Sequence, residues 1–339
     1  MTRSRDVADT QDNSGGAVAP WVGAKNFVIN GGMDIWQRGT SFVADLTYSA
    51  DRWLFNRTGG SGGSSISRST DAPTGFQYSL KNQRDSGNTI LNALDGYYSI
   101  ETTNSIPLAG KIVTLSFYMK KGANYSGGDV SITVNYGTGT DQRYYLYTGA
   151  TQVANGGVTL STSWQRFSVT GTVASTATEI GFKTSWSPTG TAGADDSVYM
   201  TGFQLEIGAV ATPFARAGGS IGGELALCQR YYYQWTAANA YSPFGVGFTQ
   251  GTTLAILYKA MPVVMRTTPT LTTTGTAANY AVMNGNVGRI ACSAVPVINQ
   301  GNPDGLILDW AATGLTAGGA IEGNANNTTS AYVGFSAEL

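Results

Sequence analysis

The 339-residue sequence contains no histidine and only two cysteines, Cys228 and Cys292. Without histidine, the chain lacks the commonest general acid–base side chain, the Ser–His and Cys–His nucleophile pairs, and most zinc and haem ligand sets. Two cysteines form neither a disulfide framework nor a cysteine cluster, so we interpret both as small buried apolar residues. We therefore expect no catalytic residue, no metal and no cofactor.

Charged residues are also scarce, at 12% of the chain, against about 25% in an ordinary globular protein. The 20 Lys and Arg nearly balance the 21 Asp and Glu, which argues against both a basic nucleic-acid binder and an acidic tail protein. No apolar stretch reaches the roughly 18 residues that a membrane span needs, and the first residues lack the apolar middle of a signal peptide. We expect a protein made in a cytoplasm, with neither nucleic acid nor membrane as a partner.

Residues 1–25 have the composition of a polar arm rather than of a folded unit. Five residues of both signs carry its charge and cannot build a core: Arg3, Arg5, Asp6, Asp9 and Asp12. A polar terminus of this kind is ordered only when something holds it, and charges of both signs can fix its register on a partner. We interpret residues 1–25 as an attachment arm. The alternative is a tail that lies on its own domain.

From residue 26 to residue 217, short segments of alternating polarity follow one another. In the segment 111–122 the alternate apolar residues are Val113, Leu115, Phe117 and Met119. Glycine-rich breakers separate such segments, and this period of two is typical of half-buried strands. The pattern predicts an antiparallel β-sandwich or barrel.

Residues 218–236 interrupt this alternation. The residues with helical spacing are Leu225, Cys228, Tyr231 and Tyr232, and Glu224 is placed for a first turn. We predict one linker helix of three or four turns that acts as a hinge. Three consecutive tyrosines cannot share one face of a helix, so at least one must meet another element or another subunit. Alternation returns over 237–339 and predicts a second, smaller β domain.

Several strings, taken together and in order, carry a resemblance. They are TRSRDVADTQDNSGG, NFVINGGMDIWQRGTSF, YSADRWLFNR, TGFQLEIG, ELALCQRYYY, MPVVMRTTPTLT and the terminal GFSAEL. In this order they resemble a family of tailed-phage virion structural proteins, usually called tail fibre proteins. The resemblance implies a jelly-roll domain similar to carbohydrate-binding modules over 26–217, a small C-terminal β domain, and homotrimers on a phage particle. Residues 58–163 match no motif of that family.

The leading hypothesis is therefore a non-enzymatic virion protein, most simply a tail fibre that binds a host receptor. Its arm would hold the phage tail, and its β domains would reach a host surface glycan. The alternative within the virion is a capsid decoration protein, such as a cement or head fibre protein, whose arm lies on the capsid proteins. A glycan-depolymerising tailspike and a cellular carbohydrate-binding module are less favoured. The number of copies per particle separates a tail location from a capsid location.

Four aromatic residues near turn-rich segments are the candidates for stacking on sugar rings: Tyr144, Tyr145, Tyr147 and Trp186. Aromatic faces stack on sugars, whereas the alternative interpretation is packing between neighbouring strands. The stacking hypothesis requires at least two of these four rings to be exposed to solvent on the side remote from residue 1. The adjacent pair Tyr97 and Tyr98 raises the same two alternatives.

A second group combines aromatic and charged residues: Trp36, Arg38, Asp51, Arg52 and Trp53. One interpretation is a sugar platform. We favour the other, in which the tryptophans fill the core and Asp51 pairs with Arg38 or Arg52.

Three carboxylates raise the question of metal binding or hydrolysis. Asp195 and Asp196 precede a predicted strand, where Ca²⁺ would need six or more oxygen ligands, and without further acidic residues nearby we favour a solvated turn. Glu206 would need a second carboxylate roughly 5–10 Å away to cleave a glycosidic bond. The possible partners are Glu101, Asp51 and Asp129. None lies in a recognisable glycosidase motif, so we expect no hydrolysis.

Overall fold

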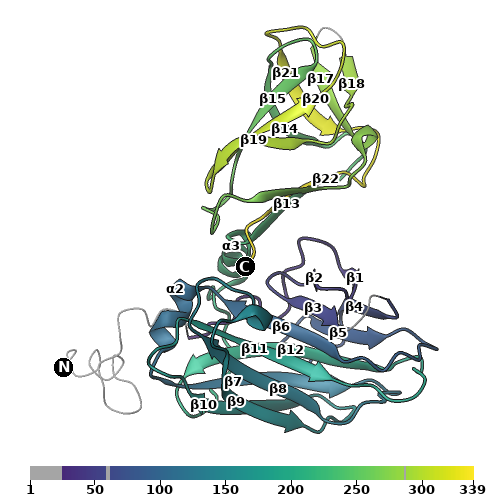
Figure 1. Ribbon diagram of the computed structural model, residues 1–339. Helices are drawn as coiled ribbons and strands as arrows, with labels where there is room; N and C mark the ends of the chain where they lie inside the picture. Colours follow the sequence, from purple (N-terminus) through teal and green to yellow (C-terminus); the bar gives the residue numbers. More distant parts are fainter. Residues whose placement is uncertain (1–24, 59–61, 286–287) are drawn as a thin grey trace, which may run out of the picture.

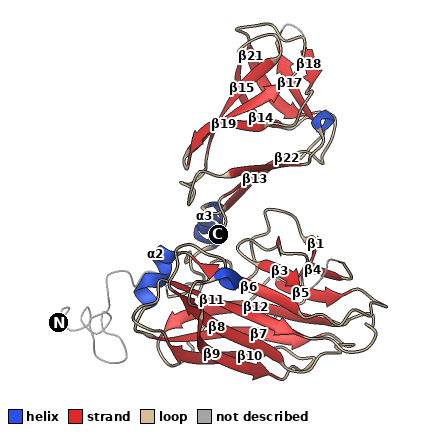
Figure 2. Ribbon diagram, viewed as in Figure 1, coloured by secondary structure: helices blue, strands red, loops and turns tan. Residues whose placement is uncertain are grey.

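The computed structural model describes residues 25–58, 62–285 and 288–339, which form two β domains joined by one short helix (Figure 1). Strands dominate both domains (Figure 2). The larger domain is a two-layer sandwich, and the smaller domain stands over the edge of it that contains β2 (Thr47–Tyr48) and β3 (Leu54–Arg57). The prediction of an all-β antiparallel sandwich, one short helix and a second smaller β domain is confirmed. Within the described part of the chain, every helix is too short or too polar to cross a bilayer.

The larger domain contains two six-stranded antiparallel sheets, named here after one central strand of each. The β12 sheet has the order β1 (Ser41–Val43), β4 (Ser64–Ser69), β5 (Ser79–Arg84), β12 (Ser197–Ile207), β7 (Ile112–Lys121) and β10 (Gln165–Thr172). The β11 sheet has the order β2 (Thr47–Tyr48), β3 (Leu54–Arg57), β6 (Leu94–Ile100), β11 (Glu179–Trp186), β8 (Val130–Gly137) and β9 (Thr151–Val158). Two short helical segments, α2 (Thr102–Ser105) and η1 (Ile106–Leu108), follow β6.

The core between the two sheets is built from the predicted alternate residues. Val113, Leu115, Phe117 and Met119 of β7 are all buried. Trp53 lies at the centre of an aromatic group, with its ring centroid 4.7 Å from that of Phe203, 5.0 Å from that of Tyr98 and 5.6 Å from that of Phe182. Trp53 is fully buried, as the packing interpretation expected.

A buried ion pair fixes one end of the sandwich. Arg84 of β5 contacts Asp196 with 2.8 Å between Nη1 and Oδ2, and both side chains are 0% exposed. Asp196 also accepts a 2.8 Å hydrogen bond from the backbone N–H of Ser126. The predicted solvated turn is therefore wrong for Asp196, whereas the partly exposed Asp195 pairs with Lys81 at 2.9 Å. Among the described residues, no group of three or more acidic or cysteine side chains is arranged to hold a metal.

The linker helix α3 spans Ile221–Gln229 and is shorter than the predicted 218–236. Ser220 caps it by accepting a hydrogen bond from the backbone N–H of Gly223, at 3.1 Å. The helix ends early because Tyr232 begins a strand, β13 (Tyr232–Thr236), which pairs with β22 (Tyr332–Ser336) from the end of the chain. Aromatic residues fit such a pairing well. The second domain therefore begins before residue 237.

The second domain packs a seven-stranded sheet against a three-stranded one. The larger sheet has the order β18 (Gly288–Ala291), β17 (Tyr280–Asn284), β21 (Ala320–Ala325), β14 (Pro243–Thr249), β15 (Leu254–Ala260), β20 (Gly305–Ala311) and β19 (Val297–Asn302). The smaller sheet has the order β13, β22 and β16 (Thr270–Thr273). Trp310, Tyr280 and Phe244 fill the space between them. Cys228 and Cys292 are both buried, as expected.

Replacing Asp196 with alanine should lower the free energy of unfolding by about 3–5 kcal/mol, because the buried Arg84 guanidinium then loses its counter-charge. The matched control is Asp129→Ala at an exposed carboxylate, which should cost less than about 1 kcal/mol. Urea unfolding of both variants checks the prediction. Equal losses in the two variants would contradict it.

Candidate functional site

The outer face of the β11 sheet, which points away from the core, carries mostly neutral polar side chains. They form three rows across the strands: Asn56–Asp95–Ser185–Ser131, Leu54–Tyr97–Lys183–Thr133–Asn155 and Ser99–Gly181–Asn135–Gln152. The residues between them on each strand point into the core, because strand side chains alternate between faces. The only charged members of the three rows are Asp95 and Lys183, so this face can offer many hydrogen bonds with little net charge.

Asp95 holds several polar side chains of this face in place. Its Oδ2 accepts hydrogen bonds from the Tyr97 hydroxyl at 2.8 Å and from the Thr58 hydroxyl at 3.0 Å, and its Oδ1 accepts one from Ser185. The Lys183 ammonium lies 3.9 Å from the same carboxylate. Burial and the nearby Asp95 charge raise the pKa of Tyr97, so this phenol stays a hydrogen-bond donor well into the alkaline range. The polar side chains are thus held in fixed directions.

A cluster of tyrosines forms one end of the face. The ring of Tyr97 lies 5.9 Å from that of Tyr144 and 5.5 Å from that of Tyr145, and Tyr144 lies 5.6 Å from Tyr147. Tyr144 and Tyr147 are 7% and 6% exposed, whereas Tyr145 is 37% exposed. Tyr145 is therefore the ring of this cluster that a ligand can reach.

The prediction that at least two of the four stacking candidates are exposed is wrong. Trp186 is only 2% exposed and packs on Tyr125 from the core side of β11. Tyr144 and Tyr147 are buried because the short helical turn η2 (Tyr144–Leu146) folds them onto the sheet. The sequence located the right segment, since Tyr145 is at the edge of the polar face, but it did not show which rings pack.

Arg143 connects Tyr145 to the end of the chain. Its Nη1 donates to the Tyr145 hydroxyl at 3.0 Å, and its Nε donates to the carbonyl oxygen of Leu339 at 2.7 Å. The Tyr48 hydroxyl donates to the same carbonyl at 3.2 Å. Burial and the charge of Glu338 raise the pKa of Tyr48 to about 12, which keeps this phenol protonated. The second domain thus contributes to the edge of the β11 face.

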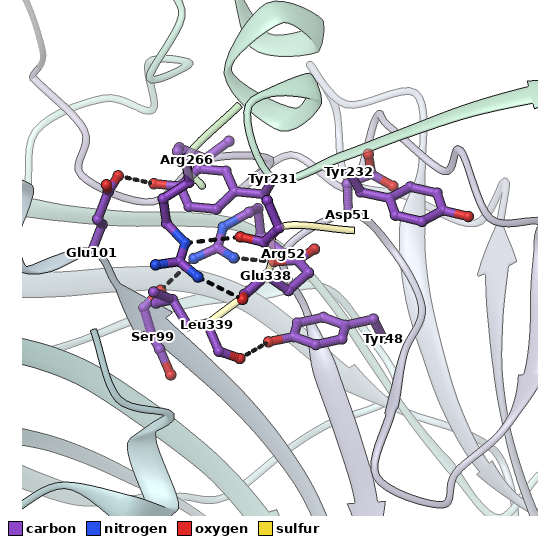
Figure 3. Close-up of polar contacts among 12 residues, drawn as sticks. Tyr48, Asp51, Arg52, Ser99, Glu101, Tyr231, Tyr232, Arg266, Glu338 and Leu339 are labelled. Carbon is purple, nitrogen blue, oxygen red and sulfur yellow. Dashed lines mark hydrogen bonds and ion pairs between the residues drawn. The ribbon is translucent and has the colours of Figure 1, made fainter. Parts of the chain in front are cut away.

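The junction between the two domains centres on Glu338 (Figure 3). Its carboxylate contacts the Arg38 guanidinium at 2.9 Å and also pairs with Arg52, and all three side chains are nearly buried. The guanidinium carbon of Arg52 lies 3.7 Å from the centre of the Tyr231 ring, and that of Arg38 lies 3.5 Å from the Tyr232 ring. These cation–π contacts place the consecutive tyrosines against the first domain. The expected pairing of Asp51 with Arg38 is also present, at 3.7 Å.

Two further ion pairs join the first domain to the residues that follow it, one to the linker and one to the second domain. Arg230 pairs with Glu101 at 2.7 Å, and Glu101 also accepts a 2.7 Å hydrogen bond from the Tyr231 hydroxyl. Arg266 pairs with Asp141 at 3.0 Å. Through Arg230 and Tyr231 the linker is therefore held against the first domain by an ion pair and a hydrogen bond. A hinge would instead need to move without breaking such contacts.

A cavity of about 150 Å³ lies beside the junction and is lined in part by Arg52, Tyr98, Glu101 and Tyr231. Its two charged lining groups already have partners, because Arg52 pairs with Glu338 and Glu101 pairs with Arg230. We assign this cavity to the packing of the junction.

Glu206 makes contacts that hold a loop. It accepts hydrogen bonds from the backbone N–H of Thr212 at 2.9 Å and from the Gln204 amide at 2.7 Å. Glu101 and Asp51 take part in the junction, and Asp129 accepts a hydrogen bond from Thr159. Each carboxylate suggested as a catalytic partner of Glu206 is thus engaged in other contacts.

The charged residues that we assigned to the attachment arm, Arg3, Arg5, Asp6, Asp9 and Asp12, lie outside the described residues, so their attachment role stays a prediction.

Sequence reasoning missed Asp95, Lys183 and Asn135. Each of the three is a polar residue that alternates with core residues along a strand, so the sequence does indicate that they lie on the outer face of a sheet. A single sequence does not distinguish a binding face from any other solvent-exposed face.

No protein-family model and no curated protein matches this chain. Among solved structures, it is similar to the enzymatically active domain of bacteriophage CBA120 tailspike protein 4, with 14% identity and a TM-score of 0.35 over 54% of this chain and 21% of that chain. It is also similar to a CBM4 module, with 18% identity and a TM-score of 0.34 over 53% of this chain and 100% of that one. A third is the C-terminal family 22 carbohydrate-binding module of Clostridium thermocellum Xyn10B, with 12% identity and a TM-score of 0.33 over 51% of this chain and 98% of that one. Similarities this distant assign no role to any residue.

Replacing Glu338 with glutamine should lower the free energy of unfolding by about 3–5 kcal/mol, because two buried guanidinium groups lose their shared counter-charge. The matched control is Glu322→Gln, at a half-buried carboxylate that contacts Asn324 rather than a cation. Thermal and urea unfolding measure both variants. If Glu338→Gln costs no more than the control, the junction does not depend on this pair.

Proposed function

We propose that the protein is a tail fibre or related virion component of a tailed phage, and that it binds a host surface glycan on the outer face of the β11 sheet. The binding proposal rests on this face, because it presents neutral polar side chains that are held by hydrogen bonds and lie next to the exposed ring of Tyr145. Sugar hydroxyls are neutral donors and acceptors, and the apolar side of a sugar ring stacks on an aromatic face.

The chemistry of the face favours a neutral or weakly charged glycan. Asn135 is half-buried, and Asn155 and Gln152 are exposed, so their amides are within reach of a ligand. Lys183 is the accessible cation of the three rows, and Asp95 beside it is nearly buried. One stacked ring contributes on the order of 1 kcal/mol, so useful attachment would need several copies acting together. A homotrimer, which we also propose, would supply them.

Two features of the sequence support the virion assignment. One is the order of the sequence strings that resemble tailed-phage virion structural proteins, and the other is the polar arm of residues 1–25. Between the two virion alternatives, a glycan-binding face favours the tail fibre over the capsid decoration protein, because a receptor-binding protein has use for such a face.

Replacing Tyr145 with alanine should weaken binding to host surface polysaccharide about fivefold, the equivalent of about 1 kcal/mol, because the stacking ring is lost. Tyr145→Phe should retain binding, since the ring remains. Calorimetric titration of the full chain measures the effect. The matched control is Tyr241→Ala, another exposed tyrosine, in the second domain. Equal losses in the two alanine variants, or no loss in either, would refute the proposed face.

We also propose that binding occurs without cleavage, because Glu206 and its possible carboxylate partners are engaged in structural contacts. Incubation with host surface polysaccharide should release no new reducing ends. Release that disappears in the Glu206→Gln variant would make the protein a depolymerase instead.

A further inference from the structure

The outer face of the seven-stranded sheet is unusual for its exposed apolar residues. Val246 and Phe248 of β14 are 71% and 53% exposed, and Tyr258 of β15 is 64% exposed. Exposed apolar patches on a soluble domain often mark binding sites. This face belongs to the second domain and shares no residue with the outer face of the β11 sheet.

Beside Tyr258, the face is hollowed into a groove of about 340 Å³. The groove lies along the hairpin of β19 and β20, and its lining includes Gln300, Gly301, Asn302 and Gly305. This volume is at the small end of the roughly 300–1,000 Å³ that is usual for ligand pockets. Of the described residues that line the groove, none is charged.

The ring of Tyr258 lies against the backbone of the hairpin because position 305 is glycine. A Cβ atom at Gly305 would lie 2.5 Å from the Tyr258 hydroxyl oxygen and 3.1 Å from the ring carbon that bears it, so any other residue at this position would force the ring to shift. The hairpin therefore covers one part of the ring, and the 64% exposure leaves the rest to solvent. The groove thus has an aromatic wall with a fixed orientation.

Two amides lie close to this wall. The Oδ1 atom of Asn302 accepts hydrogen bonds from the backbone N–H groups of Gly305 at 2.9 Å and Asp304 at 3.2 Å, which orients the amide and makes its Nδ2 the remaining donor. Gln300 is exposed and can both donate and accept. A neutral groove with one ring and two amides matches the apolar side and the hydroxyl rim of a sugar ring.

We propose that this groove is a second glycan site, which binds one neutral sugar unit by stacking on Tyr258 and by hydrogen bonds to Gln300 and Asn302. The proposal goes beyond the β11 face, because it places a separate site in the other domain and does not depend on Tyr145. The competing occupant of the face is a second copy of this chain, which would cover Val246 and Phe248 as well.

The test uses the full chain with the Tyr145→Ala substitution, which removes the stacking ring of the first site. The probe is a panel of glucose, galactose, mannose and N-acetylglucosamine with their neutral disaccharides, at millimolar concentration, observed by saturation-transfer NMR. At least one sugar should show transfer to its ring protons. Adding Tyr258→Ala should reduce that transfer at least fivefold, and adding Tyr258→Phe should preserve it.

Gly305→Ala provides an independent variant, because it displaces the ring without removing it and should also reduce the transfer. The control is Tyr241→Ala, a tyrosine of the same domain that is 46% exposed and stacks on Arg289. The proposal is overturned if no sugar of the panel shows transfer, or if Tyr241→Ala reduces it as much as Tyr258→Ala. It is also overturned if light scattering shows that Tyr258→Ala dissociates an oligomer while sugar transfer persists, because the face would then bind another copy.

Discussion

The arrangement of the two domains depends on the carboxylate of Glu338, which lies between the guanidinium groups of Arg38 and Arg52. These partners are separated from Glu338 by 300 and 286 residues of sequence. Buried charges are tolerated only when they are paired, so the pairing requires the end of the chain to return to the first domain. Its return also brings Leu339 to Arg143, the residue that contacts Tyr145. One interaction therefore joins the domain arrangement to the edge of the proposed binding face.

The two proposed glycan sites share one design. Tyr145 lies at the edge of a face with amide and hydroxyl groups, and Tyr258 lies beside the amides of Gln300 and Asn302. Each ring is positioned by a neighbour, Arg143 in one case and Gly305 in the other. Each site alone would be weak, because it offers one exposed ring. Two sites in one chain, at a separation that the junction fixes, would strengthen attachment to a glycan that repeats along a surface.

The sequence was informative wherever a local pattern decides the structure. Alternation in segment 111–122 predicted the core side of β7, and the glycine-rich breakers predicted the short strands. It failed where distant partners decide. Asp196 is buried because Arg84, 112 residues away, neutralises it. The predicted helix ends early because Tyr232 pairs with Ser336 near the end of the chain. No local pattern could show that Tyr144 and Tyr147 pack while Tyr145 remains exposed.

A crystal structure of the full chain with an oligosaccharide of the host surface polysaccharide would show whether the outer face of the β11 sheet binds a glycan. We expect a sugar ring against Tyr145, with further units along the row of Lys183, Thr133 and Asn155. A sugar bound on the outer face of the β12 sheet, with the β11 face empty, would contradict this expectation.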